Sequence, residues 1–224
     1  MVSKTSAMPS SIPARLAGRD WEIIPTSRKV VALTFDAGSD AAGTASILAT
    51  LRNDGVPATF FLTGEFAAGF PSTARAIAVA GHRIGDHSMS HPYFTHLTDA
   101  QIATQLSSAA ARITAVTGRD PRPLFRFPYG DSDARTIRTV NRNGYAAVRW
   151  TVDSLGWKGT SGGVTTDTVV TRVLGAARPG EIVLMHVGAN PDDHSTLDAA
   201  ALPRVISGLR ADGYTFITLD ALTG

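Results

Sequence analysis

Residues 30–55 read VVALTFDAGSDAAGTASILATLRNDG, and this stretch holds the pattern from which the fold follows. A short run rich in Val, Leu and Phe comes first, and such a run is typical of a buried strand. A polar, glycine-containing loop follows it. Ile47, Leu48 and Leu51 then share one helical face, and Gly55 ends the pattern. The stretch therefore predicts a strand, a loop and a helix in that order.

The same alternation continues along the chain. The predicted strands cover residues 30–35, 58–62, 83–86, 124–127, 146–152, 182–187 and 214–219. Helical patterns lie between them, and one begins with Thr98 and Gln101 as a capping box and stops at Gly118. Strands that alternate with helices indicate parallel βαβ units. A doubly wound sheet would fit this pattern, but the number of strands and the chain length favour a barrel of the (β/α) type.

The composition is that of an ordinary globular protein. The chain has 224 residues, which fits a single domain over residues 28–224 behind an N-terminal extension, residues 1–27, that is rich in Ser and Pro up to Pro13. It has no cysteine, which excludes disulfides, thiolate nucleophiles and iron–sulfur clusters. A formal net charge of +2 gives no electrostatic signature of nucleic-acid binding.

Neither a membrane span nor a signal peptide is visible in the sequence. A membrane-spanning helix needs about 18 or more consecutive apolar residues, and no such run occurs. The N-terminal residues also lack the apolar core of a signal peptide. Two interpretations follow: a cytoplasmic protein, or a mature chain from which a signal peptide has been removed.

Side chains with catalytic chemistry gather at the ends of the predicted strands. In chain order they are Asp36, His87, His91, Arg126, Tyr129, Asp153 and His186. In (β/α) barrels the active site lies at the C-terminal ends of the strands. Loops are polar in general, but that does not account for a set with three histidines and two aspartates. We therefore expect an active site at this end of the barrel.

His87 and His91 have the spacing H-x-x-x-H, which on a helical turn would place both imidazoles on one face. Two ordinary loop histidines are the alternative. A nearby carboxylate favours a metal site, because catalytic Zn²⁺ is often held by two histidines and a carboxylate. Asp36 would suit a general base, a ligand or a turn residue that bonds its own backbone. Asp40 would suit a helix N-cap equally well.

His186 ends an apolar strand, so it is either a hydrogen-bonded core histidine or a general acid. A second enzyme class is suggested by Gly159, Ser161 and Gly163, which match the G-x-S-x-G nucleophile elbow. A serine esterase would then use Ser161 with His186. The elbow needs a strand that runs straight into it, however, and residues 153–158 intervene here. A flexible glycine loop is the better interpretation.

Five short motifs together resemble the polysaccharide deacetylases of carbohydrate esterase family 4, the NodB-homology domain. TFDAG at residues 34–38 is similar to the family's TFDDG, HSMSH at 87–91 to H-[ST]-x-x-H, and RFPY at 126–129 to R-x-P-[YW]. DSLGW at 153–157 is similar to D-[ST]-x-D-W, and LMH at 184–186 to L-x-H. Each motif is weak alone, but five in the family's order over residues 28–222 are highly specific.

The resemblance implies a distorted (β/α)₇ barrel with parallel strands. It implies removal of N-acetyl groups from a polysaccharide that contains N-acetylglucosamine, with peptidoglycan the first expectation, chitin oligomers the second, and acetylxylan esterase activity a further one. It implies one divalent metal, Zn²⁺ before Co²⁺ or Ni²⁺. The expected protein is a monomer that binds an N-acetylated glycan. It would be secreted or associated with the cell wall, its signal peptide absent from this chain, with a cytoplasmic location as the alternative.

The motifs also imply a role for each matching residue on the metal and base side. Asp36 would be the general base, and His87 and His91 would be metal ligands. Arg126 would hold Asp36 in its ionised form. The backbone N–H of Tyr129 would bind the oxyanion.

On the acid side, the resemblance makes His186 the general acid and gives Asp153 the task of orienting it. Trp157 would form an apolar wall against a sugar face. Pro128 and Tyr129 would complete the substrate-binding surface.

The chain departs from the family pattern at two positions. Ala37 replaces the aspartate that supplies the family's third metal ligand. We expect Asp40 to replace it as that ligand, and a site of two histidines completed by water is the alternative. Gly156 replaces the second aspartate of D-[ST]-x-D-W, which puts substrate preference in doubt. A catalytically inactive barrel that binds glycan is the alternative that Ala37 supports. The retained set Asp36, Arg126, Asp153 and His186 argues against it.

Overall fold

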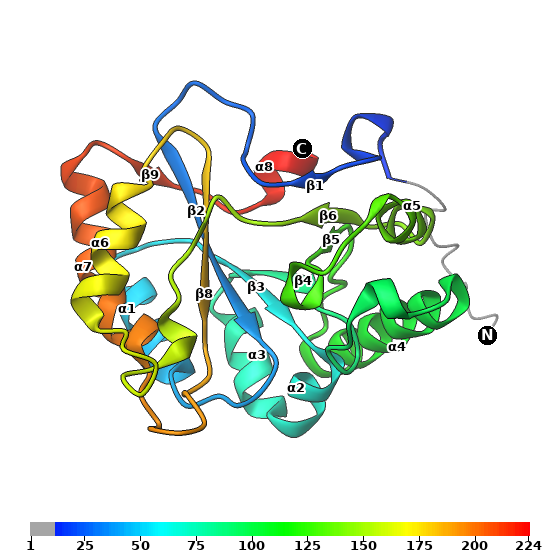
Figure 1. Cartoon of the computed structure of the whole chain (residues 1–224), viewed down its shortest axis with the longest axis horizontal. Helices are drawn as coiled ribbons and strands as arrows, with labels where there is room; N and C mark the ends of the chain where they lie inside the picture. Colours follow the sequence, from blue (N-terminus) through cyan, green and yellow to red (C-terminus); the bar gives the residue numbers. More distant parts are fainter. Residues whose placement is uncertain (1–11) are drawn as a thin grey trace.

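A curved sheet of parallel strands forms the centre of the molecule, and helices pack around it (Figure 1). The computed structural model describes residues 12–224. The strands follow the order β1-β6-β5-β4-β3-β2-β8-β7, and β9 pairs with β2 beside this path. Every pairing between these strands is parallel. The predicted α/β class with a distorted (β/α)₇ barrel is confirmed.

The elements have the following bounds. The strands are β1 (Asp20–Trp21), β2 (Val30–Ala37), β3 (Thr59–Leu62), β4 (Arg83–Asp86), β5 (Leu124–Phe125), β6 (Ala146–Val148), β7 (Val152–Asp153), β8 (Glu181–His186) and β9 (Thr215–Phe216). The helices are α1 (Thr44–Asn53), α2 (Gly64–Gly69), α3 (Pro71–Val79), α4 (Asp99–Thr117), α5 (Ala134–Arg142), α6 (Thr166–Gly175), α7 (Leu197–Ala211) and α8 (Asp220–Thr223). Short 3₁₀ turns occur at Ala14–Leu16, Phe94–His96, Pro128–Gly130 and Gly156–Lys158.

The central strand β2 is buried along its whole length, as its apolar sequence predicts. It pairs with β3 on one side and with β8 on the other. The register places Asp36 opposite Phe61 and opposite His186. Two of the predicted site residues therefore end adjacent strands at the same level.

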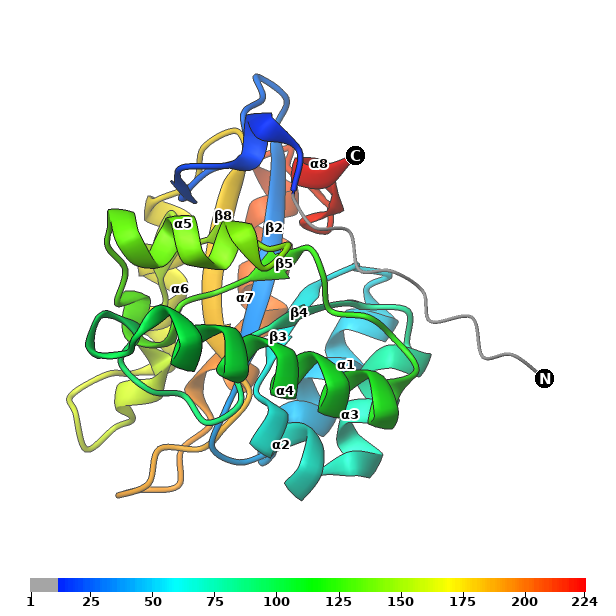
Figure 2. The same ribbon diagram turned by 90° about the vertical axis from the view of Figure 1, so that its right-hand side faces the viewer.

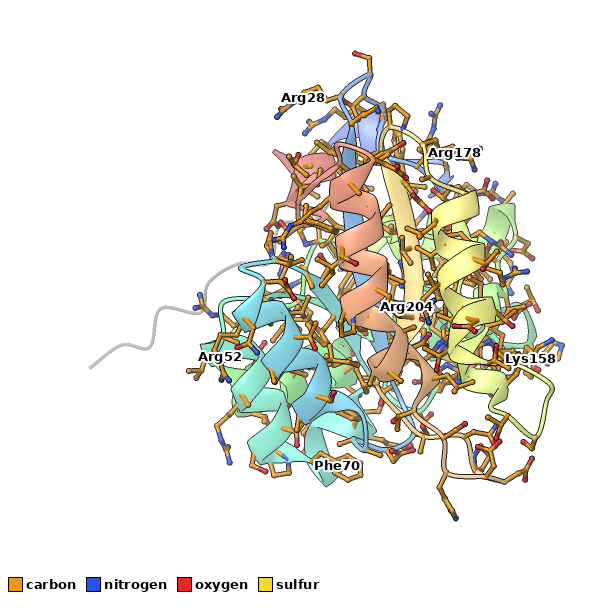
Figure 3. The ribbon with its side chains drawn as sticks, turned by 90° about the vertical axis from the view of Figure 1, so that its left-hand side faces the viewer. Arg28, Arg52, Phe70, Lys158, Arg178 and Arg204 are labelled. Atoms are coloured by element: carbon orange, nitrogen blue, oxygen red, sulfur yellow. The ribbon has the colours of Figure 1, made fainter. Side chains whose placement is uncertain are left out.

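The helices form where their patterns predict them. At the start of α4, the Thr98 side chain accepts from the Gln101 amide while the Gln101 side chain accepts from the Thr98 amide. The helix ends at Gly118 in the left-handed conformation, with φ 70°. α4 and α5 cover the β5 and β6 side of the sheet (Figure 2). α6 and α7 lie side by side on the β8 side (Figure 3).

The predicted single strand over residues 146–152 is wrong, because this segment forms two strands with different neighbours. β6 pairs with β1 and β5, whereas β7 pairs with β8. The Arg126 guanidinium accounts for the break, since it donates to the carbonyls of Val148 at 3.1 Å and Arg149 at 2.9 Å. The Thr151 amide then donates to the Ile182 carbonyl of β8 at 2.8 Å, and β8 lies next to the opposite edge of the sheet. The segment thus passes from one edge of the curved sheet to the other.

The N-terminal extension takes part in the fold from residue 12 onward, and residues 1–11 lie outside the described part of the chain. β1 pairs with β6, and Ile12, Leu16 and Ile24 are buried. The Arg15 guanidinium donates to the backbone carbonyl of Thr223 at 2.9 Å. Across residues 12–224, none of the helices has the length and apolar character that a membrane crossing requires.

Candidate active site

One cavity of about 570 Å³ opens at the C-terminal ends of the strands and collects most of the predicted site residues. Its lining includes Asp36, His87, His91, Tyr129, Asp153, Trp157 and His186. These seven residues come from five different strand ends, as expected for a (β/α) barrel. Arg126, Pro128 and Asp40 lie outside the lining, and each has a separate structural explanation below.

Arg126 lies beneath the cavity floor and fixes the Asp36 carboxylate. Its side chain is fully buried, and one of its amino groups is 2.8 Å from both Asp36 Oδ1 and Thr34 Oγ1. The guanidinium also packs over the Phe61 ring at 4.2 Å from the centroid. Burial opposes ionisation of Asp36, but Arg126 and the nearby histidines outweigh it and hold the pKa of Asp36 below its ordinary value. The predicted Asp36–Arg126 contact is present.

His87 stands between Asp36 and the backbone of Arg126. Its Nδ1 lies 2.8 Å from the Arg126 carbonyl, which can only accept, so Nδ1 carries the proton in the neutral ring. Nε2 is then an unprotonated acceptor, 3.4 Å from Asp36 Oδ2. Burial lowers the pKa of His87, which favours this neutral form. Two acceptor atoms therefore face each other, and a cation beside them would relieve the repulsion.

His91 meets His87 through a loop, which corrects the prediction of a helical turn. The two rings lie 4.8 Å apart between centroids. Ser88 and His91 adopt left-handed conformations, with φ 70° and 59°, which are uncommon outside glycine. The Ser88 hydroxyl accepts from the His91 amide at 3.0 Å, and Asp86 accepts from the Ser88 amide at 2.8 Å. Burial, the larger cause, and the neighbouring His87 lower the pKa of His91 to about 4.

The residues that support this histidine loop were missed by sequence reasoning. Asp86 is fully buried and also accepts from the Tyr145 hydroxyl at 2.7 Å. The Gln105 side chain accepts from the amide of Met89 at 2.9 Å. An aspartate inside a predicted buried strand, directly before His87, is the signal that could have identified Asp86.

Asp40 is used elsewhere and does not approach the histidine pair as a third ligand. Its carboxylate accepts from the Ala42 amide at 2.8 Å and from the Ala189 amide at 3.0 and 3.1 Å. It therefore ties the loop after β2 to the loop after β8. Within residues 12–224, no group of three His, Asp or Glu side chains is arranged to hold a metal ion. Among the described residues, the two imidazoles of His87 and His91 lie together and fit a divalent ion, and Asp36 Oδ2 is the carboxylate oxygen beside His87.

Two exposed aromatic rings border the cavity. Tyr129 is 57% exposed, stacks on Tyr93 at 4.2 Å between centroids and contacts the His91 ring edge-on at 4.5 Å. Its backbone is left-handed at φ 59°, and among the described residues its amide donates no hydrogen bond. Trp157 is 47% exposed and lies 6.5 Å from the His186 ring. Pro128 is buried and begins the turn that positions Tyr129.

The carboxylate beside His186 is not the predicted one. Asp153 lines the cavity, but its carboxylate accepts from the Leu155 amide at 2.8 Å and from the Trp157 indole at 3.4 Å. Asp198 of α7 lies 3.7 Å from His186 Nδ1 and accepts from the His186 amide at 2.8 Å. Among the described residues, Asp153 makes no hydrogen bond to His186, although its charge is one of those that raise the pKa of His186.

A sequence signal for Asp198 exists in the pattern of α7. Asp198 falls on the same helical face as Leu202, Val205 and Leu209, which are all buried. A charged residue on an apolar face is rarely buried without a partner. That anomaly could have identified Asp198 before the structure was known.

Ser161 does not form a catalytic pair with His186. It lies in a run of turns, with neither a strand before it nor a helix directly after it. Its hydroxyl donates to the Asn190 side chain at 3.3 Å, and it lies outside the cavity lining that contains His186. The geometry of a nucleophile elbow is therefore absent at this serine.

Comparisons with known proteins agree with this geometry. The family model described as polysaccharide deacetylase matches residues 24–148. The peptidoglycan-N-acetylglucosamine deacetylase of Bacillus cereus is 34% identical over 198 residues, which cover 88% of this chain and 70% of that protein. The chitooligosaccharide deacetylase of Azorhizobium caulinodans is 32% identical over 199 residues, covering 85% and 93%.

Solved structures show the same likeness and one contrast. The Bc1960 peptidoglycan N-acetylglucosamine deacetylase has a TM-score of 0.81 at 34% identity, covering 89% of this chain and 90% of that one. BA3943 of Bacillus anthracis, described as a pseudoenzyme of carbohydrate esterase family 4, has a TM-score of 0.83 at 27% identity, covering 93% and 70%. The fold is therefore shared by active and inactive proteins.

Proposed function

This chain belongs to the polysaccharide deacetylase family, and from that premise we propose a metal-dependent hydrolase that removes N-acetyl groups from a glycan containing N-acetylglucosamine. The observation that carries the proposal is the arrangement of Asp36. Its carboxylate is held by Arg126, faces His87 and lies opposite His186 across adjacent strands, all at one cavity. A buried carboxylate and a histidine that face one cavity suit a base and an acid for amide hydrolysis.

Peptidoglycan is the first substrate of the proposal and chitin oligomers are the second. The names of the relatives support both, since they include peptidoglycan and chitooligosaccharide deacetylases. The exposed rings of Tyr129 and Trp157 at the cavity support a sugar ligand, because aromatic faces pack against the apolar faces of sugar rings. Acetylated xylan would be an ester substrate of the same site. Peptidoglycan lies outside the cytoplasmic membrane, so this substrate implies a secreted or wall-associated protein.

In the proposed mechanism Asp36 is the general base. Arg126 keeps its carboxylate ionised and fixed, so it can take the proton of the water that attacks the acetyl carbonyl. His87 and His91 would hold the divalent ion, Zn²⁺ before Co²⁺ or Ni²⁺. When bound, such an ion supplies Lewis-acid polarisation and lowers the pKa of water. The Tyr129 amide, which has no other partner among the described residues, would donate to the developing oxyanion.

His186 is the general acid of the proposal. As the carbon–nitrogen bond breaks, the sugar amine needs a proton to leave, and His186 lines the same cavity as Asp36. Burial alone would lower the pKa of His186, but the carboxylates of Asp198, Asp36 and Asp153 together raise it. A raised pKa keeps the proton available near neutral pH. Acetate and a free glucosamine unit are the products.

Acetate release tests the proposal directly. The protein is incubated with peptidoglycan and with N-acetylated chitin oligomers, with and without a chelator, and acetate is measured. We expect release that chelation abolishes and Zn²⁺ or Co²⁺ restores. Full activity of the metal-stripped protein would contradict the metal mechanism, and no release from either glycan would contradict the deacetylase.

A glycan-binding barrel without catalysis is the second candidate. Ala37 at the position of the family's third ligand and the likeness to BA3943 favour it. It would bind chitin oligomers in a calorimetric titration while releasing no acetate in the presence of Zn²⁺. Turnover that Asp36→Asn removes would exclude it.

A further inference from the structure

Asp198 is a buried carboxylate that the five motifs do not include. It lies in the first turn of α7, is 3% exposed and accepts from the His186 amide through Oδ2 at 2.8 Å. Among the described residues, its Oδ1 has no hydrogen-bond partner, and neither does His186 Nδ1. The distance from Nδ1 to Oδ2 is 3.7 Å. A small rotation would bring the two groups into hydrogen-bond range, and catalytic hydrogen bonds are often this long before substrate binds.

Gly156 is the reason that Asp198 fits in this place. A Cβ atom on Gly156 would lie 2.3 Å from Asp198 Oδ1 and 2.6 Å from its Cγ. Gly156 is absent from the glycines with positive φ in the described chain, so its backbone would accept a side chain. The Asp198 carboxylate, and not the backbone, therefore requires glycine here. This is also the position at which DSLGW lacks the second aspartate of D-[ST]-x-D-W.

We propose that Asp198 is the positioning residue of His186, and that it supplies from α7 the carboxylate that residue 156 lacks. This inference rests on the proposed function, in which His186 is the general acid. A carboxylate on Nδ1–H fixes the tautomer and the ring orientation, as carboxylates do for other catalytic histidines. Nε2 then remains free to hold the proton that the leaving amine takes.

The surroundings of His186 favour Asp198 over the other carboxylates. Asp153 of β7 already accepts from Leu155 and Trp157. Asp36 of β2 is bonded to Arg126. His87 and His91 of the loop after β4 interact electrostatically with His186, and burial lowers the pKa of each. The Asp198 carboxylate alone adjoins Nδ1 with an oxygen to spare among the described residues, and its place in the first turn of α7 favours a negative charge.

Two variants test the inference. One is Asp198→Asn, and the other is a swap variant that moves the carboxylate from residue 198 to residue 156. Asp198→Asn keeps an oxygen for the His186 amide and removes only the charge, so a merely structural role predicts nearly wild-type kinetics. We expect kcat on N-acetylated chitin oligomers to fall by about 10- to 100-fold with little change in KM, the usual cost of losing such a partner. In the swap, Gly156→Asp is combined with Asp198→Ala, and we expect kcat to recover about tenfold over Asp198→Ala alone. Thermal melts verify that each variant is folded.

A titration of the His186 imidazole by NMR in the metal-free protein gives a readout that does not depend on turnover. His186→Gln identifies its signals among those of the six histidines. We expect the His186 pKa to fall in Asp198→Asn and to rise again in the swap variant. If the wild type released no acetate, the proposed function would fail while this titration still tested the contact. Unchanged kcat and an unchanged titration in Asp198→Asn would overturn the inference, as would a folded swap variant no better than Asp198→Ala.

Discussion

The side of the cavity that holds the proposed base, Asp36, and the side that holds the proposed acid, His186, are built in different ways; they are called the base side and the acid side below. On the base side, Arg126 donates to Thr34, Asp36 and two backbone carbonyls, and His87 Nε2 lies 3.4 Å from the other Asp36 oxygen. On the acid side, His186 Nδ1 and Asp198 Oδ1 are buried without partners in the described chain. The contacts of the base side join residues of the family motifs, whereas on the acid side His186 adjoins Asp198 of α7, which lies outside those motifs. This contrast indicates that Asp36 is held in one position before substrate binds, whereas the His186 ring can still adjust its position.

Removal of the base should have the largest effect. Asp36→Asn keeps the size of the side chain but cannot accept a proton, so we expect turnover to fall by about 10²–10⁴-fold. Zinc affinity should stay nearly normal, because His87 and His91 are unchanged. Measurements of kcat and a zinc titration check this. Loss of zinc would show that Asp36 is itself a metal ligand, and its proposed role as general base would then be wrong.

The loss of activity on removing the proposed acid, His186, should depend on the leaving group of the substrate. His186→Ala should reduce turnover of N-acetylated chitin oligomers by about 10²-fold or more, because an amine needs a proton to leave. An activated aryl acetate should lose much less, since its phenolate leaves unprotonated. Parallel kinetics on the two substrates measure the difference. Equal losses would mean that His186 positions substrate or supports the fold.

A carboxylate restored at residue 37 should strengthen metal binding. Ala37→Asp would give the imidazole pair an anionic neighbour, and we expect zinc affinity to rise by about tenfold, the scale on which partners of metal ligands act. Ala37→Asn is the matched control, with equal size and no charge. Zinc titrations of the two variants separate the effect of the added charge on zinc affinity from the effect of the added side-chain volume. Equal affinities would show that the end of β2 cannot direct a ligand to the histidines.

Asp40 should matter for stability and not for the metal. Asp40→Ala removes the acceptor of the Ala42 and Ala189 amides, and we expect a loss of about 1–3 kcal/mol in the free energy of unfolding. Asp40→Asn retains an acceptor oxygen and should lose less. Thermal melts and zinc titrations of both variants test this. A large drop in zinc affinity would return Asp40 to the ligand role that the sequence suggested.

Glu181 is a second buried carboxylate, and it differs from Asp36 because none of the described residues donates a hydrogen bond to it. It begins β8, the strand that His186 ends, and both its oxygens are unpartnered among the described residues. Burial raises the pKa of Glu181 from 4.5 to about 7. Between these values the unfolded chain has already released the proton that the folded protein retains. Stability therefore falls as pH rises from 4.5 to 7 and stays reduced above that range.

The ionisation of Glu181 leads to the smallest effect that we expect, a change in thermal stability with pH. Glu181→Gln cannot ionise, so its Tm should exceed that of the wild type at about pH 8, whereas the two should nearly coincide at about pH 4.5. Thermal melts across this range check the sign. A stabilisation that did not change with pH would show that packing, and not ionisation, separates the two proteins.

The sequence by itself determined the alternation of strands and helices, and it identified the strand-end residues that line the cavity. Apolar runs and helical spacing are local properties, and the family motifs are local strings. The alternation therefore predicted the parallel barrel, and the C-terminal ends of its strands brought Asp36, His87, His91 and His186 to one cavity. The Asp36–Arg126 contact was implied by the resemblance to the family, and the structure contains it.

Only the tertiary structure decided where the remaining side chains find partners. The break after Val148 depends on a guanidinium that arrives from another strand end. Asp40 turned toward the Ala189 amide, and Asp198 filled the space left by Gly156. These contacts join segments far apart in the chain, and their energies depend on burial and on which polar atoms remain unpaired. Local sequence patterns do not predict such pairings, because the two partners come close together only when the chain has packed.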